Sequence, residues 1–165
     1  MALEADDARH LLARTSFGLP RPDEIAALKE LNRAEAVEHI LNAIKTEAAT
    51  APPSWAKEPM PGWKVRQTWT EFRTRSFNKR NRFRWRELQG WWISEMLKTP
   101  APITERLVLL WHNHFTSSFD GVKWVPLLYQ QNVTFRRHAA GNFRELLEQM
   151  ITDPAMLFYL DGRRN

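Results

Sequence analysis

The sequence contains no cysteine, and this absence removes several kinds of protein at once. Disulfide-stapled scaffolds, zinc sites with cysteine ligands and thiol nucleophiles are all excluded. With six glycines and ten prolines in 165 residues, the chain is neither collagen-like nor of low complexity. No run of apolar residues approaches the roughly eighteen that a membrane-spanning helix needs.

Other familiar signals are missing as well. The first residues have neither the basic stretch nor the apolar core of a secretory signal peptide, so we expect none in this chain. The sequence also lacks a nucleophile elbow, a P-loop, a dinucleotide fingerprint and an HExxH motif. The reaction classes that depend on these motifs therefore gain no support, and no catalytic residue can be assigned.

What the sequence does contain is an uneven distribution of charge. The net charge is +5, from 24 basic and 19 acidic residues. Nine basic residues and a single acid lie between Lys64 and Arg86, so this segment carries +8 and the rest of the chain −3. One segment therefore holds all of the excess positive charge.

Apolar residues recur at helical spacing along most of the chain, between breaks at proline and glycine. We expect an all-α fold, a multi-helix array of about six to eight helices. Helices are predicted over residues 6–14, 23–31, 34–47, 104–117, 125–140, 143–151 and 154–160. Asp6 or Asp7 is expected to cap the first of them, and Asp120-Gly121 to form a turn.

The middle of the chain divides into two unlike parts. Residues 48–62 contain four prolines and no periodicity, which predicts a surface linker. Residues 63–98 contain no proline and predict a long basic and aromatic helix, or two abutting helices, with Gly90 as the weak point. We expect residues 1–165 to form one helical domain or part of a larger one.

The polar group most suited to chemistry is the pair His112 and His114, inside an apolar string. On extended backbone the two imidazoles share a face, whereas on a continuing α-helix they lie about 200° apart and cannot hold one ion. His138 and Asp161 would join them only through tertiary packing. The alternative interpretation is that these are hydrogen-bonded core histidines and a turn aspartate.

Aromatic residues alternate with arginines in the basic segment, and this pattern has two interpretations. In the first interpretation, the arginines contact phosphates and the aromatic rings stack on the bases of single-stranded nucleic acid, and the candidate binding residues are Arg80, Arg82, Arg84, Trp85 and Arg86. The other is a structural helix, because Leu88, Trp91 and Trp92 recur at core spacing, with solvated arginines opposite.

The order of these motifs resembles a bacterial family known as domain of unknown function 1800. The similarity rests on five segments in sequence: 10–18 (HLLARTSFG), 91–97 (WWISEML), 105–115 (ERLVLLWHNHF), 138–147 (HAAGNFRELL) and 153–161 (DPAMLFYLD). The string WHNHF is the most specific of them, and the basic stretch from Lys64 to Arg86 matches least well.

The resemblance implies a predominantly helical protein whose relatives are longer and continue into an acidic segment followed by further helices. We therefore expect this chain to be the N-terminal part of a larger protein. Relatives of this kind often look exported and lie beside a second family that resembles sulfatases and phosphatases. This implies a role at the cell envelope and such a protein as partner, without naming a reaction.

Two hypotheses of different classes follow. The sequence favours a metal-dependent, envelope-associated enzyme or module in which His112, His114, His138 and Asp161 contribute ligands to zinc, manganese or iron, because histidines in an apolar string are costly unless paired. The alternative is a non-enzymatic helical binding or scaffold protein that contacts polyanions through residues 64–86.

Overall fold

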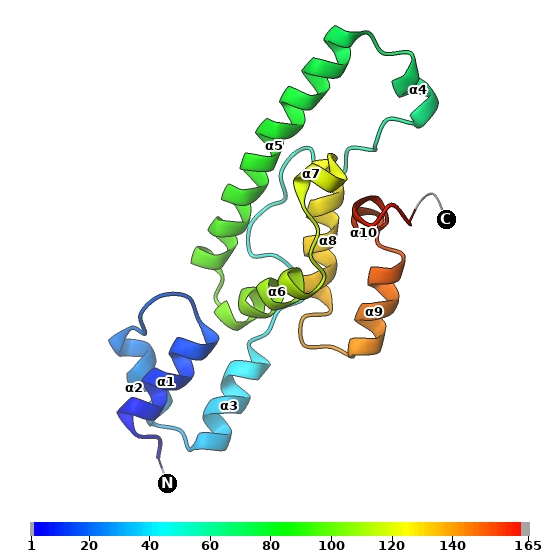
Figure 1. The fold of residues 1–165 in the computed structure, drawn as a ribbon. Helices are drawn as coiled ribbons and strands as arrows, with labels where there is room; N and C mark the ends of the chain where they lie inside the picture. Colours follow the sequence, from blue (N-terminus) through cyan, green and yellow to red (C-terminus); the bar gives the residue numbers. More distant parts are fainter. Residues whose placement is uncertain (1, 163–165) are drawn as a thin grey trace.

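The computed structural model describes residues 2–162, and over this range the chain is all-α, as predicted (Figure 1). The described residues form ten helices: α1 (Ala5–Thr15), α2 (Pro22–Lys29), α3 (Arg33–Asn42), α4 (Trp63–Gln67), α5 (Glu71–Lys98), α6 (Pro102–His114), α7 (Phe119–Val122), α8 (Val125–Arg137), α9 (Phe143–Ile151) and α10 (Pro154–Tyr159). The expected number, about six to eight, was too low. The basic segment divides into α4 and α5, and the predicted turn at Asp120-Gly121 lies within the short helix α7.

Side-chain caps explain several of the helix starts. Asn32 accepts a hydrogen bond from the Glu35 backbone N–H, and the Glu35 carboxylate accepts one from the Asn32 N–H in return. Thr70 caps α5, and the Asp153 carboxylate caps α10 just ahead of Pro154. The helix predicted over residues 6–14 is present as α1, but its predicted cap was wrong, because the residue at the N-cap is Glu4, and Asp6 and Asp7 lie within the first turn.

The first three helices form a small unit with its own core. Leu3, Ala8, Leu28 and Ala36 are buried together there. Gly18, in the loop between α1 and α2, has φ +85°, which glycine adopts without strain. The unit meets the start of α6, where the Lys45 N–H donates to the Thr104 hydroxyl over 3.0 Å.

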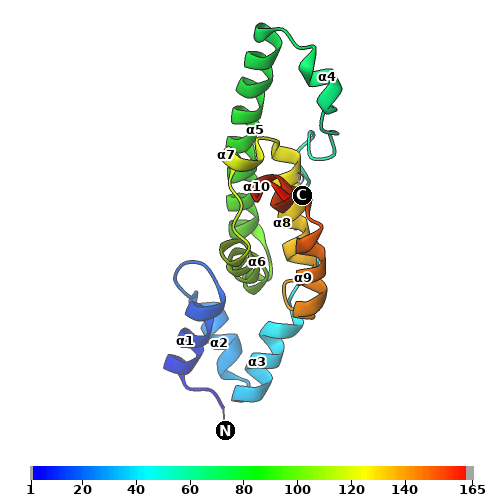
Figure 2. The same cartoon turned by 45° about the vertical axis from the view of Figure 1, so that its right-hand side comes forward.

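The main core lies where the C-terminal half of α5 packs against α6 and α8, with α7 and α10 closing one side (Figures 1 and 2). Its buried apolar residues include Leu88, Trp91, Val125, Leu128 and Ala155. Gly121 of α7 lies so close to α10 that an added Cβ would come within 2.6 Å of the Tyr159 ring. Glycine at this position therefore lets the two short helices touch.

An ion pair at the centre of this core ties three helices together. The Arg136 guanidinium of α8 donates to both carboxylate oxygens of Glu105 on α6, over 2.7 and 2.8 Å. Each of the two residues is only 1% exposed. The Trp92 indole N–H of α5 donates to the same carboxylate over 2.8 Å, and the guanidinium lies 5.5 Å from the Trp91 ring.

Residues 48–62 contain no helix, yet they contribute to the core. The Glu95 carboxylate, buried on α5, accepts hydrogen bonds from the backbone N–H groups of Ala49 and Thr50. Trp55 is buried in the main core, and its indole N–H donates to Glu87 over 2.9 Å. Neither the hydrogen bonds to Glu95 nor the burial of Trp55 could be predicted from the proline content of this segment. In the part of the chain described, no helix is both long enough and apolar enough to cross a membrane.

We expect Arg136→Met to lower the free energy of unfolding by about 3–5 kcal/mol, because it leaves the Glu105 carboxylate buried without its partner. Urea unfolding followed by tryptophan fluorescence measures the change. Arg137→Met is the matched control, since Arg137 is exposed on the next position of α8, and it should change stability by less than about 0.5 kcal/mol. The double variant Glu105→Leu/Arg136→Met should recover most of the loss, and equal losses in the single and double variants would contradict the ion-pair account.

Candidate functional site

His112 and His114 both lie in the last turn of α6, so their imidazoles point in different directions. His112 packs its ring against Trp92 and Phe135, at centroid distances of 5.2 and 6.3 Å. His114 is exposed and lies against Phe115 and Phe143 instead. Because helix continues through both residues, they do not form the two-histidine chelate that extended backbone would allow.

The other predicted ligands lie elsewhere in the fold. His138 is at the C-terminal end of α8, where its carbonyl accepts from the Gly141 N–H. Asp161 follows α10, with φ +56°. Across residues 2–162, no three histidine, aspartate or glutamate side chains are placed where they could hold a metal ion together. A metal centre that includes His112, His114, His138 and Asp161 stays a prediction.

His112 borders a small cavity between α5, α6 and α8, with a volume of about 40 Å³. Trp85, Leu88 and Trp92 form the α5 wall, at the i, i+3, i+7 spacing of one helix face. Burial lowers the pKa of His112 below its usual 6.5, because the charged imidazolium loses hydration there. At neutral pH the ring is therefore uncharged, with one nitrogen that donates and one that accepts.

A chain of buried hydrogen bonds runs beside this cavity. The Ser117 hydroxyl donates to the Gln131 amide oxygen over 2.5 Å, and the Gln131 amide nitrogen donates to the Asp153 carboxylate over 2.8 Å. The Asp153 oxygen that accepts this bond also caps α10. Burial raises the pKa of Asp153, while the hydrogen bonds from Met156, Gln131 and Ala155 oppose that shift.

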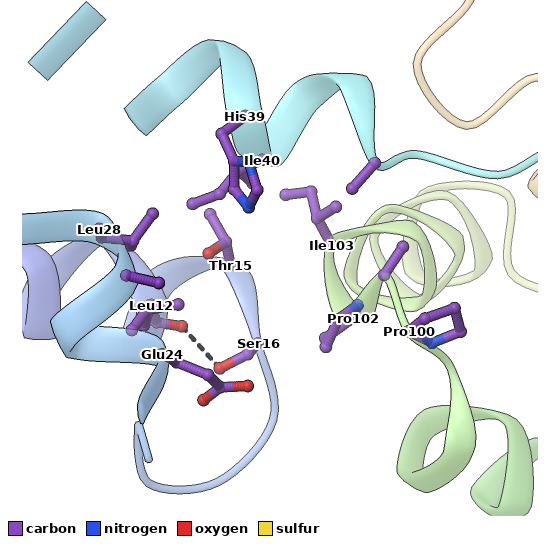
Figure 3. Close-up of a pocket in the computed structure, with 13 residues that line it drawn as sticks. Leu12, Thr15, Ser16, Glu24, Leu28, His39, Ile40, Pro100, Pro102 and Ile103 are labelled. Atoms are coloured by element: carbon purple, nitrogen blue, oxygen red, sulfur yellow. Dashed lines mark hydrogen bonds between the residues drawn. The ribbon is translucent and has the colours of Figure 1, made fainter. Parts of the chain in front are cut away.

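A larger cavity, of about 250 Å³, lies between the α1–α3 unit and the start of α6 (Figure 3). His39 of α3 faces Pro102 and Ile103 of α6 across it. The Ser16 hydroxyl on its wall is occupied by a bond to the Leu12 carbonyl, and the Glu24 carboxylate by the Arg21 backbone N–H. Its walls are otherwise mainly apolar.

The basic segment forms a projecting arm, which consists of α4 and the N-terminal half of α5 (residues 63–86). Figures 1 and 2 both show it extending past the end of α8, away from the α1–α3 unit. An aromatic stack fixes it to the core. Trp69 packs on Phe77 at 4.9 Å, and Phe77 stacks on Trp124 ahead of α8 at 5.3 Å.

One face of the arm carries a row of exposed cations. Arg75, Lys79, Arg82 and Arg86 follow the spacing i, i+4, i+7, i+11, so they lie within roughly 60° of one another around α5. We call these four residues the basic stripe. Their side chains are exposed on the side opposite Phe77, Asn81 and Leu88, which are buried. The stripe is about 16 Å long at 1.5 Å per residue.

The structure separates the five predicted binding residues. Arg82 and Arg86 belong to the basic stripe, whereas Arg80 is exposed on another side of α5. Arg84 turns inward, where it pairs with Glu58 and lies near the rings of Trp55 and Trp124. Trp85 is half-buried and stacks on Phe119 at 5.6 Å, so neither Arg84 nor Trp85 presents its side chain with the stripe.

The basic stripe could have been predicted from the helical spacing of its residues, although not from the number of basic residues alone. Helical spacing places Arg75 and Lys79 with Arg82 and Arg86, and it places Arg84 on the buried side with Phe77 and Leu88. Helical spacing likewise places Asn132, which borders the cavity beside His112, on the face of α8 that carries Val125, Leu128 and Phe135. Spacing does not show which residues of α5 and α6 lie opposite it.

Comparison with known proteins yields a family and no closer relative. A family model described as "Protein of unknown function (DUF1800)" matches residues 10–165, which is nearly the whole chain. No curated protein matches the chain, and no solved structure matches it.

We expect His112 to titrate below pH 6.5 in the native protein, because burial disfavours its charged form. The unfolded chain binds this proton more tightly, so the free energy of unfolding should fall as pH drops from 6.5 through the native pKa. An NMR titration of the His112 Cε1–H signal gives the native pKa. Urea unfolding of His112→Gln should lack that part of the pH dependence. A native midpoint at or above 6.5 would contradict the burial argument.

Proposed function

For this chain, which belongs to the DUF1800 family, we propose a binding function: it is a helical module that holds an extended polyanion against the α4–α5 arm. The observation that carries the proposal is the basic stripe, four exposed cations in one row on a projecting helix. Closely spaced anionic groups along a polymer match such a row, because each cation meets one of them without bending the helix.

Neighbouring charges leave most of the stripe available. Glu71 pairs with Arg75 over 2.5 Å at the exposed N-terminal end of α5, and exposed pairs of this kind contribute little. Among the described residues, no salt bridge involves Lys79, Arg82 or Arg86. The stripe therefore keeps a positive potential that would attract a polyanion from solution.

Two exposed aromatic rings flank the stripe. Phe72 is 80% exposed and Phe83 is 62% exposed, and their spacing of eleven positions puts both rings along one edge of the stripe. Rings in this position provide surfaces on which bases or sugars would stack, beside cations that contact phosphate or sulfate. They favour single-stranded nucleic acid over a polyanion without flat groups.

The metal-dependent alternative has less support. Its two central histidines point apart at the end of α6, and a neutral His112 would still need partners that the described residues do not supply. Polyanion binding by the arm needs no residues beyond those described, because its cations already lie in one row. We therefore place the polyanion-binding function first.

We expect binding of a fluorescent oligothymidylate of about twelve nucleotides to weaken roughly 50-fold between 50 and 200 mM salt, as four released counterions require. Arg75→Gln/Lys79→Gln/Arg82→Gln/Arg86→Gln should remove most of the affinity and of the salt dependence. Fluorescence anisotropy measures both.

The control variant is Arg14→Gln/Lys29→Gln/Arg137→Gln/Arg144→Gln, which removes the same charge from four exposed positions outside the arm. It should bind the oligothymidylate nearly as well as the unchanged protein. If both quadruple variants lose affinity equally, net charge and not the stripe causes the binding, and the proposal is wrong.

The flanking rings allow a separate prediction about the class of polyanion. We expect Phe72→Ala/Phe83→Ala to weaken oligothymidylate binding by about 1–3 kcal/mol for each stacked base, and to leave heparin binding nearly unchanged. Competition anisotropy with each polymer makes the comparison. Equal losses for the two polymers would show that the rings do not select for bases.

A further inference from the structure

The cavity between the α1–α3 unit and the start of α6 is large enough to hold a small organic molecule (Figure 3). An engineered apolar cavity of about 150 Å³ binds benzene, which has six heavy atoms, so this cavity of about 250 Å³ admits a molecule of roughly ten. Most of its wall is apolar, from Leu12, Leu28, Ile40 and Ile103. The molecule that fits is therefore mainly apolar, and the few polar atoms of the wall select its polar group.

The polar side chains that residues 12–28 contribute to this cavity offer acceptors alone. The Thr15 hydroxyl donates its hydrogen to the Leu11 carbonyl over 2.8 Å. The Ser16 hydroxyl likewise donates to the Leu12 carbonyl, over 2.7 Å. Because a hydroxyl has one hydrogen, each of these oxygens has only lone pairs left, and the Glu24 carboxylate can only accept as well.

The facing wall adds few hydrogen-bond donors. Pro100 and Pro102 have no backbone N–H to give. The backbone N–H of Ala101, between them, already donates to the Thr99 hydroxyl over 3.2 Å. Among the described residues that line the cavity, His39 is the only one whose side chain still has a hydrogen to donate. The wall as a whole therefore matches a ligand that donates.

The charge around this cavity favours a cation. Glu24 is among the residues that line it, and no lysine or arginine is among those described. The Glu24 side chain is 34% exposed, so it is not closed off from a ligand. Arg21 lies 3.1 Å from Glu24 and 3.6 Å from Asp23, so two carboxylates share one guanidinium and the group carries −1. The opposing effect of the α6 N-terminus is equivalent to about half a positive charge, which is smaller.

We propose that this cavity binds a primary amine with an apolar body, whose ammonium group donates hydrogen bonds to the Glu24 carboxylate. An ammonium group has three donors and no acceptor, which suits a wall of acceptors. The apolar body lies against Leu28 and Ile103. The site is independent of the polyanion-binding proposal, because the arm that carries the basic stripe extends away from the α1–α3 unit (Figures 1 and 2).

Three probes with one phenyl ring and different polar groups test the proposal: 2-phenylethylamine, 2-phenylethanol and phenylacetate. Each is titrated at pH 7 into the ¹⁵N-labelled protein, and NMR follows the backbone amides of Thr15, Ser16, Ala43 and Ile103. We expect saturable shifts at these amides with 2-phenylethylamine, which is protonated at this pH. Binding of 2-phenylethanol should be roughly tenfold weaker, because it lacks the charge, and phenylacetate should give no saturable shift.

Two charge variants test the role of Glu24. Glu24→Gln keeps an acceptor for the Arg21 backbone N–H and removes the charge, so the affinity for 2-phenylethylamine should fall to that for 2-phenylethanol. Glu38→Gln removes the same charge from an exposed position of α3 that does not line the cavity. It should keep the preference for the amine, and equal losses in the two variants would contradict a specific contact with Glu24.

Two size variants test whether the probes enter the cavity. Ala27→Phe adds a ring to its wall and should abolish binding of both 2-phenylethylamine and 2-phenylethanol. Ala26→Phe, at the next exposed position of α2 and outside the wall, should bind both normally. If Ala27→Phe does not fold, the three probes on the unchanged protein still decide the matter. Equal affinity for the amine and the alcohol, tighter binding of phenylacetate, or no saturable shift would each overturn the proposal.

Discussion

The rest of the structure depends on the bidentate ion pair between Glu105 and Arg136. Two charges that are each 1% exposed are tolerated only when the hydrogen bonds around them are well formed. That requirement fixes α6 against α8, and the Trp92 indole, which donates to the same carboxylate, fixes α5 against both. A shift of α6 or α8 by one turn would leave a buried charge unpaired, and a shift of α5 would remove a hydrogen bond from the same carboxylate.

As a consequence, the two halves of α5 have different roles. Its C-terminal half is held in the core through Leu88, Trp91 and Trp92. Its N-terminal half projects beyond α8 and is anchored by Phe77 and the inward-turned Arg84. Because one side of the projecting half is committed to these anchors, the opposite side is free to present the basic stripe.

Much of the fold was predictable because helix boundaries depend on local chemistry. Pro154 after Asp153 marks the start of α10, and Pro22 marks that of α2. The central ion pair was not predictable, since Glu105 and Arg136 look like ordinary helix-surface residues until three helices meet. The same holds for Trp55, whose burial follows from contacts with α5 far along the chain.

The candidate sites likewise include features that the sequence predicts and features that depend on tertiary packing. Helical periodicity alone locates the basic stripe, and it separates Arg84 from Arg82 and Arg86. It also predicts that His112 and His114 diverge if the helix continues through them, which it does. The cavity beside His112 forms only where α5, α6 and α8 meet, so neither composition nor spacing locates it.

The central claim is that one face of α5 is the surface that contacts a polyanion. Backbone amide shifts of the ¹⁵N-labelled protein on addition of oligothymidylate test it most directly, because they locate the contact residue by residue. The account predicts shifts concentrated in α5 between Phe72 and Arg86, with little change in the α1–α3 unit and α9. Shifts spread evenly over the basic residues of the whole chain, or concentrated outside the arm, would contradict it.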